Sequence, residues 1–158
     1  MKKNIKNLAI VIGLGSLLIS CSTKEIDILE PSLPGTYTYK AAIVSRPVDT
    51  NNDGVFNTDL TKEGNECGWD NIWKYYEGDR VVLSEGNTIC DVNFPDAGEF
   101  TYTYDPKKRI IIIKYKGLGE EILNDVKLGF SDNYKQTLSY TLFNNRLQQE
   151  VTYYLISI

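Results

Sequence analysis

The sequence predicts an all-β domain, a single up-and-down β-barrel of about eight antiparallel strands. Two observations carry this prediction. Short segments in which apolar and polar residues alternate recur along the chain, and turns rich in Gly, Asn and Asp separate them. The 158 residues include 11 Tyr and 5 Phe, and Tyr, Thr, Val and Ile dominate the second half, a composition typical of β proteins. The rival is a two-sheet sandwich, because counting strands does not distinguish closure from stacking.

The first strand is expected over Tyr37 to Ile43, with Tyr37, Tyr39, Ala41 and Ile43 on one face and Pro47 ending it. Segment 121–130 is also predicted to be a strand, although its apolar residues fit neither the helical nor the strand period cleanly. The remaining strands are expected at 71–76, 80–84, 100–104, 110–115, 137–142 and 147–155, with a further short run that reaches residue 90.

A polar loop, 49–60, matches the first half of a calcium-binding loop. Oxygen-bearing side chains alternate in it, and Gly54 permits the sharp turn that such loops make. Leu60 occupies the twelfth position, where a bidentate Glu is usual. The alternative is a loop of Asx turns that holds no metal. After it, Thr58 is expected to cap one short helical turn that stops at Gly64. The expected calcium ligands are Asp49, Asn51, Asp53, the Val55 carbonyl and Asn57.

The N-terminus has a basic segment, then the uncharged apolar run 8–19, then Leu18-Ile19-Ser20-Cys21. The run is shorter than the ~20 residues that cross a bilayer and has the length of a secretory signal. The four-residue motif resembles the lipobox of bacterial lipoproteins, which implies that Cys21 becomes a lipidated N-terminus. The expected organisation is a signal peptide at 1–20, a lipidated tether at 21–34 and the barrel domain at 35–158. The expected location is the cell envelope, at the outer membrane, on either its periplasmic or its surface side.

Charge excludes one class of partner. The chain has 17 Lys and Arg against 21 Asp and Glu, and three of the lysines lie in the expected signal peptide. The mature chain would therefore carry 14 basic and 21 acidic side chains, a net charge of −7. A domain this acidic has no electrostatic footprint for nucleic acid, and its attachment to a membrane would depend on the lipid.

Cysteine and histidine counts exclude much catalytic chemistry. Cys67 and Cys90 remain after lipidation, and in an oxidising compartment the expectation is one disulfide, with a catalytic thiol as the alternative. The chain has no His, so a Cys–His or Ser–His pair is impossible and the common zinc sites are disfavoured. Acidic pairs such as Glu120 with Glu121 lie in turns or at strand ends, which favours a solvated surface over a glycosidase site. We therefore expect no enzymatic activity.

Several separated features together resemble one family. They are the lipobox, the opening Gly35-Thr36-Tyr37, the Asp-rich loop, Asp59-Leu60, Cys67 with Asp70 behind it, Cys90, and Gly98-Glu99-Phe100. In this order they resemble the lipocalin-like domain lipoproteins of Gram-negative bacteria, over nearly the whole mature chain. The resemblance implies a small β-barrel, a Cys67–Cys90 disulfide and no known catalytic activity. The chain departs from the pattern in having Gly68-Trp69 before Asp70 and no Trp in the Gly98 strand.

The inward faces of the predicted strands are rich in tyrosine. One reading is a cavity that binds a small apolar or amphipathic molecule, with aromatic walls and hydroxyls that orient the ligand. The other is a filled core, which would make the protein a structural or accessory lipoprotein that contacts a partner protein or glycan through its loops. The residues expected to line a ligand site are Tyr37, Tyr39, Phe100, Tyr102, Tyr104, Tyr140 and Tyr153.

Overall fold

The computed structural model describes residues 31–64, 68–88 and 98–158. Its strands are β1 (Gly35–Val48), β2 (Asn57–Asp59), β3 (Ile72–Tyr75), β4 (Arg80–Ser84), β5 (Gly98–Asp105), β6 (Ile110–Tyr115), β7 (Gly119–Phe130), β8 (Gln136–Asn144) and β9 (Gln149–Ser157), with one short 3-10 helix, η1 (Leu60–Lys62). All pairings are antiparallel, in the order β2-β1-β3-β4-β5-β6-β7-β8-β9, and β1 also pairs with β9.

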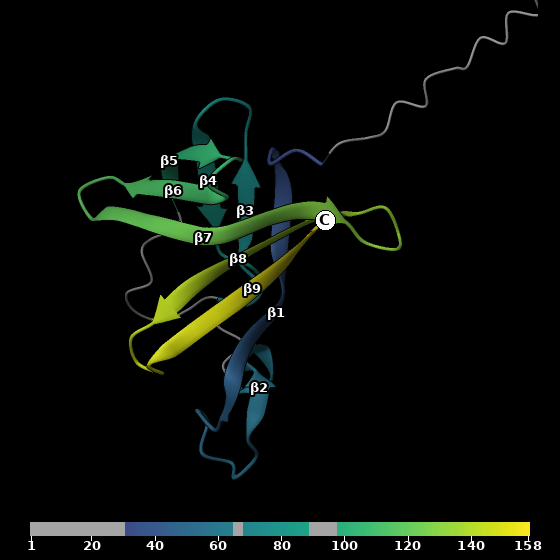
Figure 1. Ribbon diagram of the computed structural model, residues 1–158, viewed down its shortest axis with the longest axis vertical. Coiled ribbons are helices and arrows are strands. Elements are labelled where there is room, and N and C mark those ends of the chain that lie inside the picture. Colours follow the sequence, from purple (N-terminus) through teal and green to yellow (C-terminus); the bar gives the residue numbers. More distant parts are fainter. Residues whose placement is uncertain (1–30, 65–67, 89–97) are drawn as a thin grey trace, which may run out of the picture.

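Eight strands, β1 and β3–β9, therefore close into an up-and-down barrel. The ninth strand, β2, lies beside the second half of β1, which extends below the barrel in Figure 1. The prediction of an all-β, lipocalin-like barrel of about eight strands is confirmed, and the sandwich is excluded because β1 and β9 are paired edge to edge. Strands β4 and β6 have the predicted bounds.

Where the strands are regular, the alternation of apolar and polar residues explains which side chains form the barrel core. In β6, Ile111 and Ile113 are 0% and 1% exposed, while the intervening Ile112 and Lys114 are not buried. In β8, Leu138 and Tyr140 are buried in the same way. Because each strand is amphipathic, closing the sheet brings all these apolar faces to one interior.

The prediction of which β1 residues face inward is wrong for the second half of the strand. Ala42 and Val44 are buried, at 0% and 2% exposed, whereas Ile43 is 37% exposed. The cause is a β-bulge: the register with β9 shifts between Tyr39 and Ala41, so the faces exchange after Tyr39. The Ala42 N–H at this bulge donates to Asp59 Oδ1 at 3.1 Å. Asp59 thus satisfies a backbone group in the stretch of β1 between its pairings with β3, which end at Thr38, and with β2, which begin at Ile43.

Pro47 does not end β1, which continues to Val48 and pairs there with Asn57 of β2. Pro47 is exposed and lies within the register shift between Ile43 and Val48, where a residue without an N–H is tolerated. On the other edge of β1, the buried Gln149 side chain replaces a neighbouring strand. Its Oε1 accepts the Arg46 N–H at 3.0 Å and its Nε2 donates to the Arg46 carbonyl at 3.2 Å.

The cap of the short helical turn also differs from the prediction. Asp59, not Thr58, is the N-cap of η1, and its carboxylate accepts the Thr61 N–H at 3.2 Å and the Thr61 hydroxyl at 2.9 Å. Leu60 then packs into a small second core with Ala42, Val44 and Val151. Asp59 therefore joins the β1 bulge, η1 and this second core.

A second bulge explains why segment 121–130 fits neither period. Between the pairs Asn124–Thr141 and Lys127–Ser139, β7 contains one residue more than β8, and Asp125 has a φ of +50°. Leu123 and Val126 are consequently both buried, although they are three residues apart. The prediction of a strand here is confirmed, and the bulge is the reason for its broken alternation.

Replacing Asp59 by Ala is expected to lower the free energy of unfolding by about 3 kcal/mol, because it strips the buried Ala42 N–H of its partner and η1 of its cap. Asp59→Asn retains an acceptor oxygen and should lose less. Partial burial raises the pKa of Asp59, but the hydrogen bonds from Ala42 and Thr61 outweigh it and hold the pKa below its usual value. The carboxylate's contribution is therefore complete above the unfolded-state pKa and is lost as pH falls through the folded-state pKa. Urea unfolding at pH 7 and at acid pH measures both effects; equal stability of Asp59→Ala and wild type would contradict the prediction.

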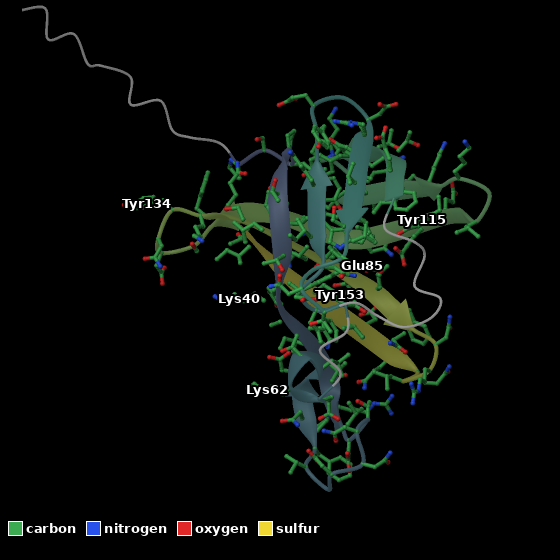
Figure 2. The ribbon with its side chains drawn as sticks, turned by 180° about the vertical axis from the view of Figure 1, so that it is seen from behind. Lys40, Lys62, Glu85, Tyr115, Tyr134 and Tyr153 are labelled. Atoms are coloured by element: carbon green, nitrogen blue, oxygen red, sulfur yellow. The ribbon has the colours of Figure 1, made fainter. Side chains whose placement is uncertain are left out.

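One end of the barrel is filled with side chains. Tyr37 is fully buried there, its hydroxyl donates to the Leu33 carbonyl at 3.1 Å, and its ring packs edge-on against Tyr75. Leu33 itself is 3% exposed and belongs to the main core, so the domain begins within the segment expected to be a tether. Nearby, Tyr134 extends from the β7–β8 turn into solvent (Figure 2). The start of β1 therefore marks a closed end.

Candidate functional site: a cavity in the barrel

The other end of the barrel contains a cavity of about 640 Å³. Strands β1, β3, β4, β6, β7, β8 and β9 contribute to its wall, and the β6–β7 and β8–β9 turns add the exposed Leu118 and Arg146. The cavity is partly open to solvent, and these turns lie at the end opposite to the start of β1. Its aromatic lining residues are Tyr39, Trp69, Trp73, Tyr75, Tyr115, Tyr140 and Tyr153.

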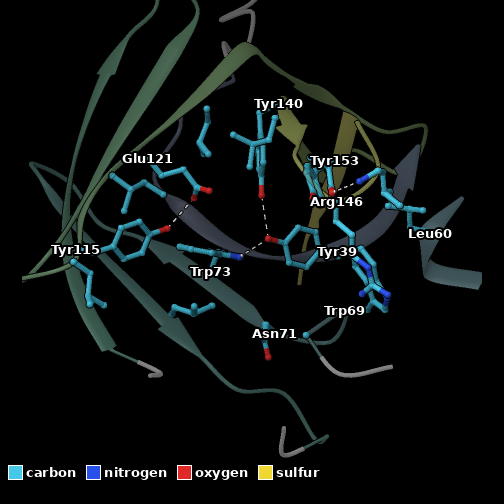
Figure 3. Close-up of a pocket in the computed structure, with 18 of the residues that line it drawn as sticks. Tyr39, Leu60, Trp69, Asn71, Trp73, Tyr115, Glu121, Tyr140, Arg146 and Tyr153 are labelled. Atoms are coloured by element: carbon cyan, nitrogen blue, oxygen red, sulfur yellow. Dashed lines mark hydrogen bonds between the residues drawn. The ribbon is translucent and has the colours of Figure 1, made fainter. Parts of the chain in front are cut away.

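A hydrogen-bonded network crosses the cavity wall (Figure 3). Trp73 Nε1 donates to the Tyr39 hydroxyl at 3.0 Å, and the Tyr39 and Tyr140 hydroxyls lie 3.0 Å apart. Each hydroxyl has one hydrogen, and a single hydrogen bond joins the two, so one hydroxyl hydrogen has no acceptor among the described residues. Burial raises the pKa of both tyrosines, which keeps them protonated at neutral pH. The network can therefore donate to an oxygen or nitrogen atom of a ligand.

Ring-to-ring contacts hold the aromatic walls in place. The Tyr140 and Tyr153 rings stack with centroids 5.2 Å apart, and Tyr39 packs edge-on against Trp69 at 5.8 Å. Trp73 stacks on Tyr75 at 6.4 Å. Such pairs contribute about 0.5–1.5 kcal/mol each beyond buried area. The cavity is thus lined by side chains that are already ordered without a ligand.

Three carboxylates line the cavity. Glu120 is exposed, and the other two, Glu63 and Glu121, lie in different surroundings. Glu63 is 3% exposed and accepts hydrogen bonds from the Thr50 backbone N–H, the Thr50 hydroxyl at 3.1 Å and Asn57 Nδ2 at 2.7 Å. Its hydrogen bonds with Asn57 and Thr50 lower its pKa below the usual value. Glu121 accepts one described hydrogen bond, from the Tyr115 hydroxyl at 2.9 Å (Figure 3). Burial, followed by the charge of Glu121, raises the pKa of Tyr115, so that hydroxyl remains a donor.

The structure brings together three of the seven residues expected to line a ligand site. Tyr39, Tyr140 and Tyr153 face the cavity. Tyr37 and Tyr102 belong to the closed end, where the Tyr102 hydroxyl donates to the Tyr76 carbonyl at 2.8 Å. The other two expected residues, Phe100 and Tyr104, pack against the core but do not line this cavity.

The sequence-based assignment of Glu121, with Glu120, to a solvated surface is wrong for Glu121, which is half-buried and lines the cavity. Tyr115 was not among the residues expected to line a ligand site. A signal for Glu121 exists in hindsight: it lies two residues before the buried Leu123, hence on the same face of β7, and it pairs with the buried Ile113 of β6. A carboxylate on the inner face of a barrel strand is unusual enough to indicate function. Trp69 and Trp73 also line the cavity wall.

The loop expected to bind calcium is bonded to itself. Asp49 accepts the backbone N–H groups of Asp53 and Gly54 at 3.1 and 3.0 Å, and Asp53 accepts that of Val55 at 2.7 Å. Asn51 accepts the Asp53 N–H at 3.2 Å. The side chain of Asn57 is turned toward Glu63 instead. Over 31–64, 68–88 and 98–158, no group of three or more His, Cys, Asp or Glu side chains could hold a metal ion.

We expect this loop to bind calcium no more tightly than the roughly millimolar range of weak extracellular sites, since its oxygens already accept the loop's own N–H groups. The melting temperature should be the same in 0.1 mM calcium and in excess chelator. Asp53→Ala should lower it equally in both. A calcium-dependent rise that Asp53→Ala abolishes would establish a metal site.

Comparisons with protein-family models, with curated proteins and with solved structures found no match. Cys21, Cys67 and Cys90 lie outside the described residues, so the expected lipidation and disulfide stay predictions. In the part of the chain that the structure describes, no helix is long and apolar enough to cross a membrane.

Proposed function

We propose that this protein is a lipid-anchored envelope lipoprotein whose lipocalin-like barrel binds one small apolar or amphipathic molecule. The observation that carries the binding function is the cavity of about 640 Å³ inside the barrel. Cavities that bind small molecules are usually about 300–1,000 Å³, mainly apolar and aromatic, with a few placed polar groups. The lining of this cavity, with its Tyr39–Tyr140–Trp73 network, has that character.

The lipid anchor is supported by the sequence, through the basic N-terminal segment, the apolar run and the motif that ends at Cys21. The resemblance to lipocalin-like domain lipoproteins supports the same assignment. We propose no catalytic activity: the chain has no His, and the two buried or half-buried cavity carboxylates, Glu63 and Glu121, have separate hydrogen-bond partners.

An uncharged fluorescent probe, N-phenyl-1-naphthylamine, is expected to bind the folded domain with enhanced emission. Leu142→Trp adds bulk inside the cavity and should weaken binding ~10-fold or more, which corresponds to about 1.4 kcal/mol. The matched control is Phe143→Trp, the next residue, which is 57% exposed on the outer face and should leave affinity unchanged. Circular dichroism checks that both variants fold.

Two results would overturn the binding function. One is a wild-type protein that does not bind the probe, and the other is equal affinity in Leu142→Trp and Phe143→Trp. Either result would favour the accessory lipoprotein, which contacts a partner protein or glycan through its loops.

A further inference from the structure

We infer that the ligand of the barrel is an amphipathic organic cation, an ammonium group on an apolar body, with Glu121 as its counter-charge. This inference rests on the proposed ligand-binding function and specifies the charge of the ligand. It distinguishes this barrel from one that takes fatty acids or neutral lipids.

Glu121 is placed to meet a ligand. It is half-buried on the inner face of β7, and its carboxylate points into the cavity beside Tyr115 (Figure 3). Among the described residues only the Tyr115 hydroxyl donates to it, and none of the ion pairs includes it. A carboxylate has about four acceptor sites, so most of its hydrogen-bonding capacity faces the cavity.

Glu63 and Glu121 differ in the number of hydrogen-bond donors that the fold supplies to each carboxylate. Glu63 is more deeply buried, but three donors from Thr50 and Asn57 surround it. Its charge is compensated within the fold. Glu121 has a single neutral donor, which leaves its negative charge without compensation from a described side chain.

The charge of the whole lining favours a cation. Its ionisable acidic and basic side chains are Glu63, Glu120, Glu121 and Arg146, a formal net charge of −2. Arg146 is exposed on the β8–β9 turn. The two internal segments outside the described residues, 65–67 and 89–97, contain no Lys or Arg in sequence. Arg146 is thus the single basic side chain of the described lining and lies at the mouth, whereas no strand residue of the described lining is basic.

The aromatic walls add attraction for the same kind of ligand. The faces of Tyr and Trp rings attract ammonium groups through the ring quadrupole, by about 0.5–2 kcal/mol per contact depending on solvation. Seven aromatic residues line this cavity. The pKa of Tyr39 and the pKa of Tyr153 are both raised, first by burial and then in part by the negative charge of Glu121. The charge of Glu121 therefore acts across the cavity. Carboxylate and rings therefore act on one volume.

Desolvation decides against the other ligand classes. A neutral apolar ligand that fills the cavity would remove water from Glu121 and offer nothing in return, and burying an unpaired charge is costly. A fatty acid would bring a second carboxylate into the same space. An ammonium group also loses water, but it brings an opposite charge to Glu121, while its alkyl or aryl body covers the apolar wall.

The test uses three ligands with one decyl chain: decyltrimethylammonium, decanol and decanoate, each below its micelle concentration. Their affinities are measured at low salt and pH 7.5 by displacement of N-phenyl-1-naphthylamine. We expect the cation to bind ~10-fold or more tightly than the alcohol, and the anion to bind most weakly. Glu121→Gln keeps the shape and an acceptor for Tyr115, and it should bring the cation to the affinity of the alcohol.

The control is Glu150→Gln, which changes the net charge equally at an exposed position of β9 and should preserve the preference for the cation. If Glu121→Gln does not fold, Tyr115→Phe provides a second measurement. It removes the described donor to Glu121 and should strengthen the preference for the cation, so a weaker preference would contradict the inference.

The outcomes separate this inference from the proposed function. If the probe and decanol bind but the cation is not preferred, or if Glu121→Gln retains the preference, the inference is wrong and the binding function stands. If the wild-type protein does not bind the probe, the binding function itself is wrong.

Discussion

Tyr37→Ala is expected to lower the free energy of unfolding by about 3–5 kcal/mol, the usual cost of removing a buried aromatic ring. Tyr37 is fully buried at the closed end, in contact with Tyr75, and its hydroxyl holds the Leu33 carbonyl at 3.1 Å. The loss is a large share of the stability of a domain of this size, typically about 5–15 kcal/mol. The melting temperature should fall by roughly 10–20 °C.

Two variants separate the causes of this loss. Tyr37→Phe keeps the ring and removes the hydrogen bond, so it should cost about 0.5–1.5 kcal/mol. Tyr134→Ala removes a tyrosine that is 89% exposed and should change stability by less than about 0.5 kcal/mol. Comparable losses in Tyr37→Ala and Tyr134→Ala would show that the closed end is not packed as described.

Alkaline titration provides a further measurement on Tyr37. Burial, followed by the neighbouring Tyr102, raises the pKa of Tyr37 to about 12. A raised folded-state pKa stabilises the protein fully below the unfolded-state pKa, about 10 for tyrosine, and this contribution is lost as pH rises through the folded value. Stability should therefore decrease between pH 10 and 12, and Tyr37→Phe should reduce the slope.

Cys21→Ala is expected to remove the protein from the membrane fraction almost completely. The proposed attachment consists of the acyl chains on Cys21, and each buried methylene contributes about 0.8 kcal/mol to membrane binding. The mature chain expected after removal of residues 1–20, with a net charge of −7, would have no electrostatic attraction to anionic lipid that could replace them. Fractionation of cells that express each variant, with and without detergent, measures the effect.

The matched control is Ser22→Ala, the next residue, which should stay with the membrane. The barrel should fold equally in both variants, as near-ultraviolet circular dichroism of its tyrosines would show, because position 21 precedes the first described core residue, Leu33. Detergent-sensitive membrane association of Cys21→Ala would refute the lipid anchor.

The regular strands could be predicted from sequence because their signal is local. In β6 and β8, neighbours two residues apart share a face, and burial at Ile111, Ile113, Leu138 and Tyr140 follows that period directly. Alternation and turn residues therefore specified the all-β class and the approximate number of strands. The sequence alone also carries the whole argument for an export signal and for lipidation at Cys21.

The tertiary structure decided where the alternation breaks. The bulges after Tyr39 and at Asp125 exchange the inner and outer faces of β1 and β7, so Ala42 and Val126 are buried out of phase. Distant partners satisfy backbone groups at and beside these bulges: the Arg109 carbonyl accepts the Val126 N–H, and the Asp59 carboxylate accepts the Ala42 N–H. Those partners are separated in sequence by 17 residues in both cases, so no local pattern reports them.

The sequence favoured a closed barrel without excluding a sandwich, and it did not determine whether the barrel contains a cavity. Whether tyrosines fill a barrel or line a space depends on how rings from different strands meet: Tyr37 and Tyr102 fill the closed end, while Tyr39, Tyr140 and Tyr153 stand around a cavity of about 640 Å³. Composition and periodicity are the same for both groups. The sequence determined which faces are apolar, and packing between distant strands determined which of them enclose a space and left the Glu121 carboxylate facing it.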